Sequence, residues 1–478
     1  MSDSKKQQTL GGNFAQDSFL LDRALRINES FDLVTKPVVV GERKGKFYLI
    51  DGFAKDELLE KVMQFLFSVK PEALAPLKSA QDFADRFIPY TETEIVPFVG
   101  DVVTQVLSGT IALILDGFAG AVMIDARTYP ARSVGEPDDD RVLRGAHDGF
   151  VETLVMNTAL IRRRLRDPAL TMRYVRATDS SRADVVLCYL SGTADEKMVA
   201  QLVKKIESIR ARTLTMGQES LAETLIPRQW FNPFPRIRYT ERPDTAAACV
   251  AEGKIIIITD NSPSVMILPV TLFDFVQDTN DFYFPPAVGS YLRLLRIAVF
   301  LLTLFLTPVW FLLVENPQWI PEWLAFIKVE EPNTVPIVAQ LLIIEFMLDA
   351  LKLASLNTPS ALSTSFSVVS ALILGDFAIQ AGWLVPEVVL YMAFVATGNF
   401  TQPSFELGYA FKFSRIVMIV LTAIGGAWGF SAAVVLLVLT IAFTRTVTGR
   451  SYLAPLIPFN AGRFAKIFFR GPISRKNT

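Results

Sequence analysis

The chain is poor in the side chains on which most metal and redox sites depend. Its 478 residues include one histidine, His147, and two cysteines, Cys188 and Cys249. The cysteines lack CxxC spacing and stand among apolar residues, which is typical of buried thiols. One histidine and two isolated cysteines cannot assemble the usual zinc sites within one chain. We therefore expect neither a metal nor a cofactor.

Catalytic motifs are also missing. The sequence contains no Walker A loop, no GxGxxG after a strand, no GxSxG elbow and no HExxH. His147 could act as a general base by residue type, but it lacks an obvious nucleophile partner and stands in a loop before a helix. A structural or solvent-exposed histidine is the commoner case. We expect a protein that is not an enzyme.

Charge of either sign is scarce. The formal net charge is −1 and charged residues make up 20% of the chain, whereas a nucleic-acid binder needs a strongly basic domain. Mean hydropathy is +0.35, which is high for a soluble protein and predicts membrane segments. The N-terminal stretch has no apolar core of a signal peptide, so we expect a cytoplasmic N-terminal region.

Apolar runs dominate only after about residue 290, which predicts an α/β cytoplasmic region of two related subdomains followed by an α-helical polytopic membrane domain. The expected boundaries are a polar flexible leader over 1–35, subdomain 1 over 36–130, a connector over 131–144, subdomain 2 over 145–290, a transmembrane domain over 291–445 and a basic cytoplasmic tail over 446–478.

Two pairs of segments support an internal duplication. Residues 46–69 and 184–206 each show an apolar strand, a turn at Gly52 or Gly192, and an amphipathic helix. Residues 109–125 and 253–269 each show a β-rich run, an Asp-containing turn and a Val-Met-Ile run, which is the pattern of a hairpin. The match is loose, and chance similarity between hairpins is the competing explanation.

Ile297–Val314 is an uncharged run of eighteen residues and is the firmest membrane span. Further apolar runs cover 335–356, 362–384, 386–400 and 416–443. The last is interrupted by glycines at 425, 426 and 429, which allows a tilted helix or a short hairpin. The basic tail belongs inside by the positive-inside rule, so both termini should be cytoplasmic, with four or six crossings.

Two sets of polar residues within the membrane runs are candidates for a pore or gate. Glu345, Asp349 and Lys352 share one helical face. They indicate an ion pathway or an inter-helix polar lock, or else a face near the inner interface where Asp349 pairs with Lys352. A second stripe comprises Ser360, Ser363, Ser367 and Ser370, with Asp376 beyond it. It could line a pore or mediate helix packing.

A basic helix follows His147 and is a candidate assembly surface. Asp148 is the expected N-cap, and an apolar stripe runs along the helix. Its C-terminal end carries Arg162, Arg163, Arg164 and Arg166, which we expect to fan around the exposed surface. Contact with acidic loops, a neighbouring protomer or anionic lipid is favoured over nucleic acid.

Several stretches together resemble the A subunits of bacterial spore-germination receptors, the GerA family. They include "RGAHDGFVETLVMNTALIRRR", "FNPFPRIRYTERPDTAAACVAEG", "PSFELGYAFKFSR" and "SYLAPLIPF". The resemblance covers nearly the whole chain from about residue 36 and is closest to the SpoVAF branch. His147 replaces a position that is usually basic in the family, which argues against a histidine-specific role.

The resemblance implies a multi-pass protein of the spore inner membrane that acts in germination. It implies a homo-oligomer, a pentamer being suspected, that contacts membrane lipid, a small membrane partner protein and other germination receptor subunits, and binds no nucleic acid. The leading hypothesis is an oligomeric channel that releases cations and amplifies or transduces the germination signal. The alternatives are a non-conducting scaffold for receptor or dipicolinate-channel complexes, and a transporter of a small acid.

Overall fold

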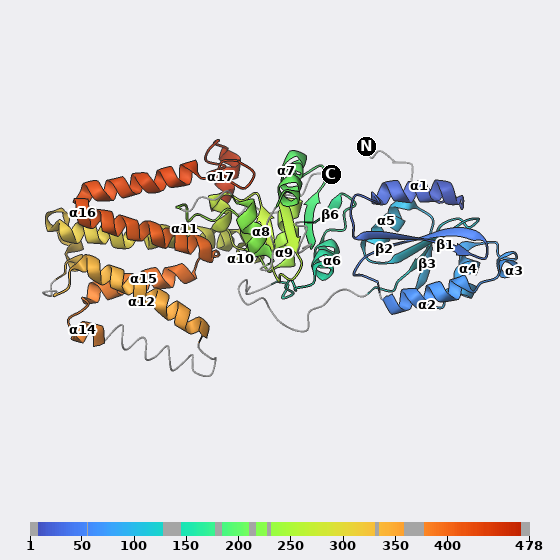
Figure 1. Cartoon of the computed structure of the whole chain (residues 1–478), viewed down its shortest axis with the longest axis horizontal. Helices are drawn as coiled ribbons and strands as arrows, with labels where there is room; N and C mark the ends of the chain where they lie inside the picture. The colour runs from blue at the N-terminus through green and yellow to red at the C-terminus, as the bar shows by residue number, and fades with distance from the viewer. Residues whose placement is uncertain are drawn as a thin grey trace. The chain divides into compact units, whose positions relative to one another are not determined.

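The computed structural model describes residues 8–54, 56–127, 145–176, 184–209, 217–226, 231–329, 334–357 and 377–469. The chain forms two compact units. Unit 1 comprises Met1–Arg228 and Ile237–Pro269, and unit 2 comprises Gln229–Arg236 and Val270–Thr478. The strands lie in unit 1 and the long helices in unit 2 (Figure 1). The division thus falls after residue 269 rather than at the expected 290, and residues 229–236 belong with the helices.

The first half of unit 1 is built around a five-stranded antiparallel sheet with the order β1-β2-β4-β5-β3. Its strands are β1 (Leu33–Val40), β2 (Arg43–Ile50), β3 (Thr93–Val96), β4 (Ile111–Leu115) and β5 (Ala121–Ile124). Its helices are α1 (Phe14–Leu25), α2 (Asp56–Phe67), α3 (Pro71–Leu74), α4 (Ala80–Phe87) and α5 (Val99–Leu107).

Both faces of this sheet are buried. Along β2, Phe47 and Leu49 join one apolar cluster with residues of α2 and α4, whereas Tyr48 and Ile50 join a second cluster with residues of α1 and α5. Successive side chains of a strand point to opposite faces. The continuous apolar strands therefore form the middle layer of a helix–sheet–helix sandwich.

The second half of unit 1 repeats this arrangement. Its sheet has the order β6-β7-β9-β10-β8, with β6 (Leu170–Arg176), β7 (Asp184–Leu190), β8 (Arg238–Thr240), β9 (Ile255–Thr259) and β10 (Val265–Leu268). Its helices are α6 (Leu154–Arg164), α7 (Glu196–Glu207), α8 (Gln218–Leu225) and α9 (Pro243–Ala251).

The shared strand order confirms the two related α/β subdomains. The turns that suggested the repeat also correspond, since Gly52 and Gly192 have φ of 81° and 83° after β2 and β7. In the β9–β10 turn Asn261 adopts φ 58°, a conformation that asparagine tolerates better than most side chains.

The predicted flexible leader is wrong for the part of residues 1–35 that the structure describes. Helix α1 begins after Asn13, whose side chain accepts a hydrogen bond from the Gln16 amide. Leu21 and Leu25 on this helix are fully buried in the core of subdomain 1. Apart from Asp17, which is buried, the polar residues of α1 lie on the solvent side of an amphipathic helix. The expected connector 131–144 lies outside the described residues.

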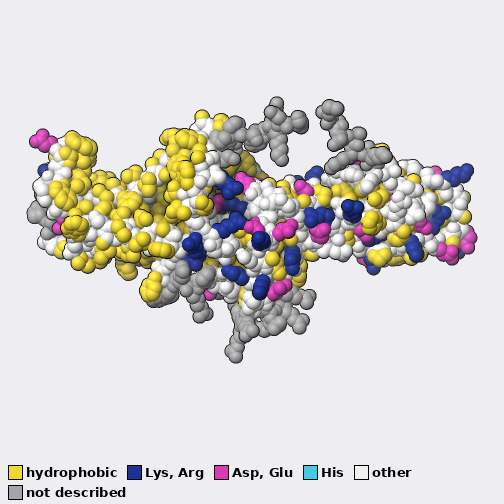
Figure 2. All heavy atoms as spheres, turned by 90° about the horizontal axis from the view of Figure 1, so that it is seen from above, with side chains coloured by type: hydrophobic (Ala, Val, Ile, Leu, Met, Phe, Trp, Pro, Cys, Tyr) yellow, Lys and Arg dark blue, Asp and Glu magenta, His cyan; other side chains and the backbone are white. Residues whose placement is uncertain are grey.

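Unit 2 consists mainly of helices. The long ones are α11 (Pro286–Glu315), α12 (Ile337–Asn357), α15 (Pro386–Phe400) and α16 (Phe405–Phe443). Shorter elements are η1 (Leu272–Phe275), α10 (Asn280–Tyr283), η2 (Pro317–Trp319), η3 (Glu322–Ile327), α14 (Ala378–Gln380) and α17 (Ala461–Phe468). Among the described residues, α11 and α16 are long and apolar enough to cross a membrane. Apolar side chains gather over these helices, whereas charged ones lie mostly over unit 1 (Figure 2).

Helix α16 reverses direction in its middle. Gly426 has φ 53° and ψ −133°, which interrupts the helical conformation. A Cβ built on Gly429 would stand 1.8 Å from the Leu421 carbonyl oxygen, although eight residues of continuous helix span about 12 Å. The two halves of α16 therefore form a hairpin, which Figure 1 shows as two adjoining rods. Of the two expected alternatives for 416–443, the hairpin is the observed one.

Candidate functional site

A cluster of four charged side chains lies inside the helix bundle of unit 2. Glu345 and Asp349 come from α12, one turn apart, and Lys412 and Arg415 come from the first half of α16. Residues three or four apart share a helix face, so each helix presents a pair of like charges to the opposite pair. We call these four residues the charge cluster.

Arg415 and Glu345 form its inner pair. The Arg415 Nε donates to Glu345 Oε1 at 2.6 Å, and Nη1 donates to the Thr303 carbonyl oxygen of α11 at 2.7 Å. Arg415 is fully buried and Glu345 is 3% exposed. The pair thus links α11, α12 and α16, and each buried charge has a partner, without which its burial would be costly.

Lys412 and Asp349 form the outer pair. The Lys412 ammonium donates to the Glu345 carbonyl oxygen at 3.0 Å, lies 3.5 Å from Glu345 Oε2 and pairs with Asp349. The Asp349 side chain is 36% exposed, against 7% for Lys412. The inner pair is thus enclosed by protein, whereas the outer pair reaches the surface of the bundle.

Lys352, the third member of the predicted face, does not join the cluster. Its ammonium lies over the rings of Phe400 and Tyr409, 5.6 and 5.5 Å from their centroids. The ion pair of Asp349 is with Lys412, whereas one expected alternative has Asp349 pair with Lys352. The serine stripe of Ser360, Ser363, Ser367 and Ser370, together with Asp376, lies outside the described residues.

Sequence reasoning missed Lys412 and Arg415. A signal was present, since two basic residues three positions apart interrupt the apolar sequence that opens α16. The acidic pair on α12 is four positions apart, so both pairs lie within one turn and share a helix face. Matching the acidic pair of one helix with a basic pair of another helix would identify Lys412 and Arg415 as partners.

The prediction that Arg162 of unit 1 lies on the exposed surface is wrong. Its guanidinium is fully buried and binds Asp32, with Nε to Oδ2 at 2.8 Å and Nη2 to Oδ1 at 3.1 Å. Nη2 also donates to the Leu170 carbonyl oxygen, and Nη1 to that of Asp167. Ser30 completes the site by donating to Asp32 and accepting from the Met172 amide. This buried pair joins the two subdomains.

Arg163 and Arg164 of α6, and Arg166 just after it, lie nearer the surface. Arg163 is exposed, Arg164 binds both carboxylate oxygens of Asp148 at 2.6 Å, and Arg166 donates to Ser108 Oγ at 3.2 Å. Asp148 is therefore not the N-cap of the helix, which begins after Thr153. His147 is exposed in the preceding loop.

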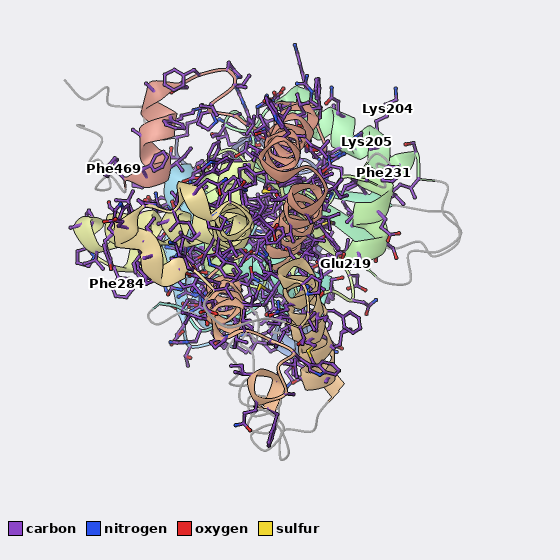
Figure 3. The ribbon with its side chains drawn as sticks, turned by 90° about the vertical axis from the view of Figure 1, so that its left-hand side faces the viewer. Lys204, Lys205, Glu219, Phe231, Phe284 and Phe469 are labelled. Carbon is purple, nitrogen blue, oxygen red and sulfur yellow. The ribbon has the colours of Figure 1, made fainter. Side chains whose placement is uncertain are left out.

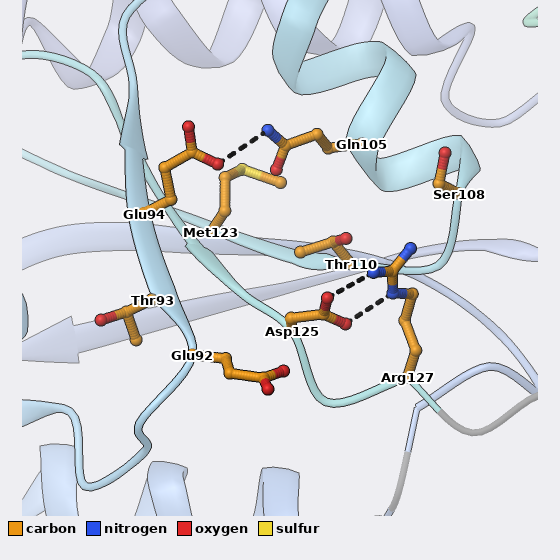
Figure 4. A pocket seen from close by; sticks show the side chains of 9 residues that line it. All are labelled: Glu92, Thr93, Glu94, Gln105, Ser108, Thr110, Met123, Asp125 and Arg127. Atoms are coloured by element: carbon orange, nitrogen blue, oxygen red, sulfur yellow. Dashed lines mark hydrogen bonds and ion pairs between the residues drawn. The ribbon is translucent and has the colours of Figure 1, made fainter.

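A polar groove of about 410 Å³ opens at the edge of the first sheet (Figure 4). Its lining is mostly polar: Glu92, Thr93, Glu94, Gln105, Ser108, Thr110, Met123, Asp125 and Arg127. Arg127 binds Asp125 through two nitrogens and lowers the pKa of that carboxyl, and Gln105 donates to Glu94 at 3.2 Å. Arg127 thus neutralises Asp125, whereas Glu94 accepts a hydrogen bond from a neutral amide. No group of three or more His, Cys, Asp or Glu suited to a metal ion occurs among the described residues.

Comparison with known proteins gives consistent matches. Over 458 residues the chain is 35% identical to stage V sporulation protein AF of Bacillus subtilis (strain 168), covering 96% of this chain and 92% of that protein. The uncharacterized membrane protein YfkQ of the same organism is 30% identical, covering 78% and 72%. Spore germination protein KA, also from that organism, is 25% identical, covering 93% and 82%.

A solved structure also matches: the N-terminal domain of the A subunit of the Bacillus megaterium spore germinant receptor GerK3. It aligns with a TM-score of 0.41 and 20% identity, over 55% of this chain and 97% of that one. The family profile described as Bacillus/Clostridium GerA spore germination protein matches residues 23–478. The profile and the relatives agree over nearly the full length, and the chain belongs to the GerA spore germination protein family.

Proposed function

We propose that this protein is a subunit of an oligomeric ion channel that releases cations from the spore and amplifies or transduces the germination signal. Membership of the GerA family supports the role in germination. Two apolar helices long enough to span a bilayer support a membrane location. We place the protein in the spore inner membrane with both termini in the cytoplasm, beside other receptor subunits and a small membrane partner.

The charge cluster is the observation that carries the channel proposal. Ionisable side chains inside a membrane bundle are costly and usually mark an ion path or the device that controls it. The inner pair, Glu345 and Arg415, binds three helices together through Thr303. In the outer pair, the Asp349 side chain is partly exposed and the Lys412 side chain is buried. We infer that the inner pair maintains the fold and that the outer pair separates when the channel opens.

We propose the serine stripe, Ser360, Ser363, Ser367 and Ser370, together with Asp376, as the pore lining. A single stripe cannot enclose a pore, so the proposal requires several copies, and a pentamer is our expectation. The arginines of α6 are proposed to contribute to assembly through Arg163, which is exposed. Arg162 serves instead within the subunit.

Ion efflux from vesicles tests the proposal. The full chain is reconstituted in vesicles loaded with K⁺, and efflux is followed for the native protein and for Lys412→Met. This variant breaks the outer pair and the Lys412 contacts with Glu345, and it leaves the Arg415–Glu345 hydrogen bond in place. If that pair contributes about 1 kcal/mol to the closed state, efflux should rise about five-fold. Ser367→Leu should block both the basal and the raised efflux.

Lys328→Met is the matched control, because Lys328 is an exposed lysine at the end of η3 outside the cluster. It should leave efflux unchanged. Absence of efflux from the native chain and from Lys412→Met, with the protein folded and oligomeric, would contradict the channel and favour the scaffold. Saturable uptake of a small acid would favour transport instead.

A further inference from the structure

The C-terminal segment of unit 2 carries positive charge only. Residues 444–478 contain Arg445, Arg450, Arg463, Lys466, Arg470, Arg475 and Lys476, without any Asp or Glu. Such a segment attracts anionic surfaces. Two copies of it would repel each other, which disfavours a symmetric contact between protomers through this face.

Hydrogen bonds and ring contacts place this segment where α11 begins. The Leu272 amide, fourteen residues before α11, donates to the Tyr452 carbonyl oxygen at 3.0 Å. The Phe273 and Phe464 rings meet edge to face, with centroids 6.3 Å apart, and α17 packs against α11 itself. Because α11 is a candidate membrane span, α17 lies beside the end at which the chain enters the apolar bundle.

Helix α17 has distinct inner and outer faces. Ile467 is buried, and Phe464 and Phe468 are half-buried with their rings 5.2 Å apart. Arg463 is exposed and lies one turn before Ile467, at the edge of this stripe. The helix therefore packs on unit 2 through its apolar stripe, with the exposed Arg463 at the edge of that stripe.

Large apolar side chains flank Arg463 in the sequence. Ile457, Phe459 and Phe469 are 54%, 67% and 60% exposed. Phe469 lies at the outer rim of unit 2 in Figure 3, on the same side of the view as Phe284. Aromatic rings beside basic residues are the composition of helices that lie in a membrane interface, where rings enter the acyl boundary and cations meet phosphates.

We propose that α17 and its flanking residues bind the anionic phospholipid headgroups of the leaflet in which α11 begins. Arg463 pairs with lipid phosphate, while Phe459 and Phe469 enter the acyl boundary on either side. Because α17 packs against α11, a candidate membrane span, this surface reaches the bilayer without any further anchor. Apolar flanks at the start of a span would otherwise remain in water, which the hydrophobic effect disfavours.

Fluorescence of a single attached probe tests the proposal. Phe469→Cys is labelled with an environment-sensitive dye in the full chain, reconstituted in vesicles of phosphatidylcholine alone or mixed with phosphatidylglycerol. Cys188 is fully buried, which raises its thiol pKa to about 12, and Cys249 is also buried. The dye should shift to the blue and be quenched by headgroup-proximal spin-labelled lipid. Arg463→Gln should lower the inserted-to-exposed ratio about five-fold in the anionic vesicles only.

Phe19→Cys is the matched control, because Phe19 is similarly exposed at 63% but lies on α1 of unit 1. Its dye should stay unquenched. Phe459→Cys gives a second reading should Phe469→Cys fail to fold. Lipid-independent emission at both positions would overturn the proposal. So would a blue shift that grows with protein density without lipid quenching, which would indicate a second copy as the occupant.

Discussion

At the residue scale, the most consequential side chain of unit 1 is Arg162. It is buried together with Asp32 between the subdomains and donates to two backbone carbonyl oxygens as well. Removing one partner of a buried pair leaves an uncompensated charge and costs about 3–5 kcal/mol. We predict that Arg162→Met lowers the free energy of unfolding of unit 1 by about that amount, measured by denaturant-dependent reactivity of the buried Cys188 thiol.

The neighbouring Arg163 provides the control, since it is exposed. Arg163→Met should change the free energy of unfolding by about 0.5 kcal/mol or less. Adding Asp32→Asn to Arg162→Met should recover part of the loss, because no unpaired charge then remains. Equal effects of the two arginine substitutions would contradict a specific role for the buried pair.

At the scale of elements, the hairpin of α16 depends on its glycines. Gly426 occupies a backbone conformation that only glycine adopts readily, and Gly429 lies against the Leu421 carbonyl. We predict that Gly426→Val costs about 1–3 kcal/mol and that Gly429→Leu prevents the close return of the chain. Both should lower the thermal midpoint of tryptophan fluorescence in detergent.

Gly425 is the matched position for these variants. A Cβ at this residue meets nothing within 4 Å, and its φ is not positive. Gly425→Ala should therefore leave the midpoint within about a degree, since an alanine is the better helix former. If Gly425→Ala lowered the thermal midpoint as much as Gly426→Val, the backbone conformation of Gly426 would not be the reason for the loss.

At the scale of the whole molecule, the natural probes report on separate units. Both cysteines lie in unit 1, and all six tryptophans fall within the residue ranges of unit 2. We predict that Arg162→Met shifts the thiol-detected unfolding transition and leaves the tryptophan-detected one in place. Gly426→Val should do the reverse. Coincident shifts of both transitions for either variant would show that the two units unfold as one.

Local sequence patterns determine much of the fold of this protein. Apolar strands, glycine turns and amphipathic helices recur in the same order in both halves of unit 1. They are predictable because each feature depends on residues that are close in sequence. Helical periodicity likewise predicts α11 and the shared face of Glu345 and Asp349. The predicted leader is wrong because the polar face of α1 does not reveal which apolar side chains the fold buries beneath it.

Only the tertiary structure decided which charges meet. Asp32 is separated from Arg162 by 130 residues and Glu345 from Arg415 by 70. Periodicity shows which face of a helix a charge occupies but not which other helix that face meets. The burial of Arg162 and the joining of α11, α12 and α16 at Arg415 are therefore properties of packing, because a charge is stable in an apolar interior only where the fold supplies its partner.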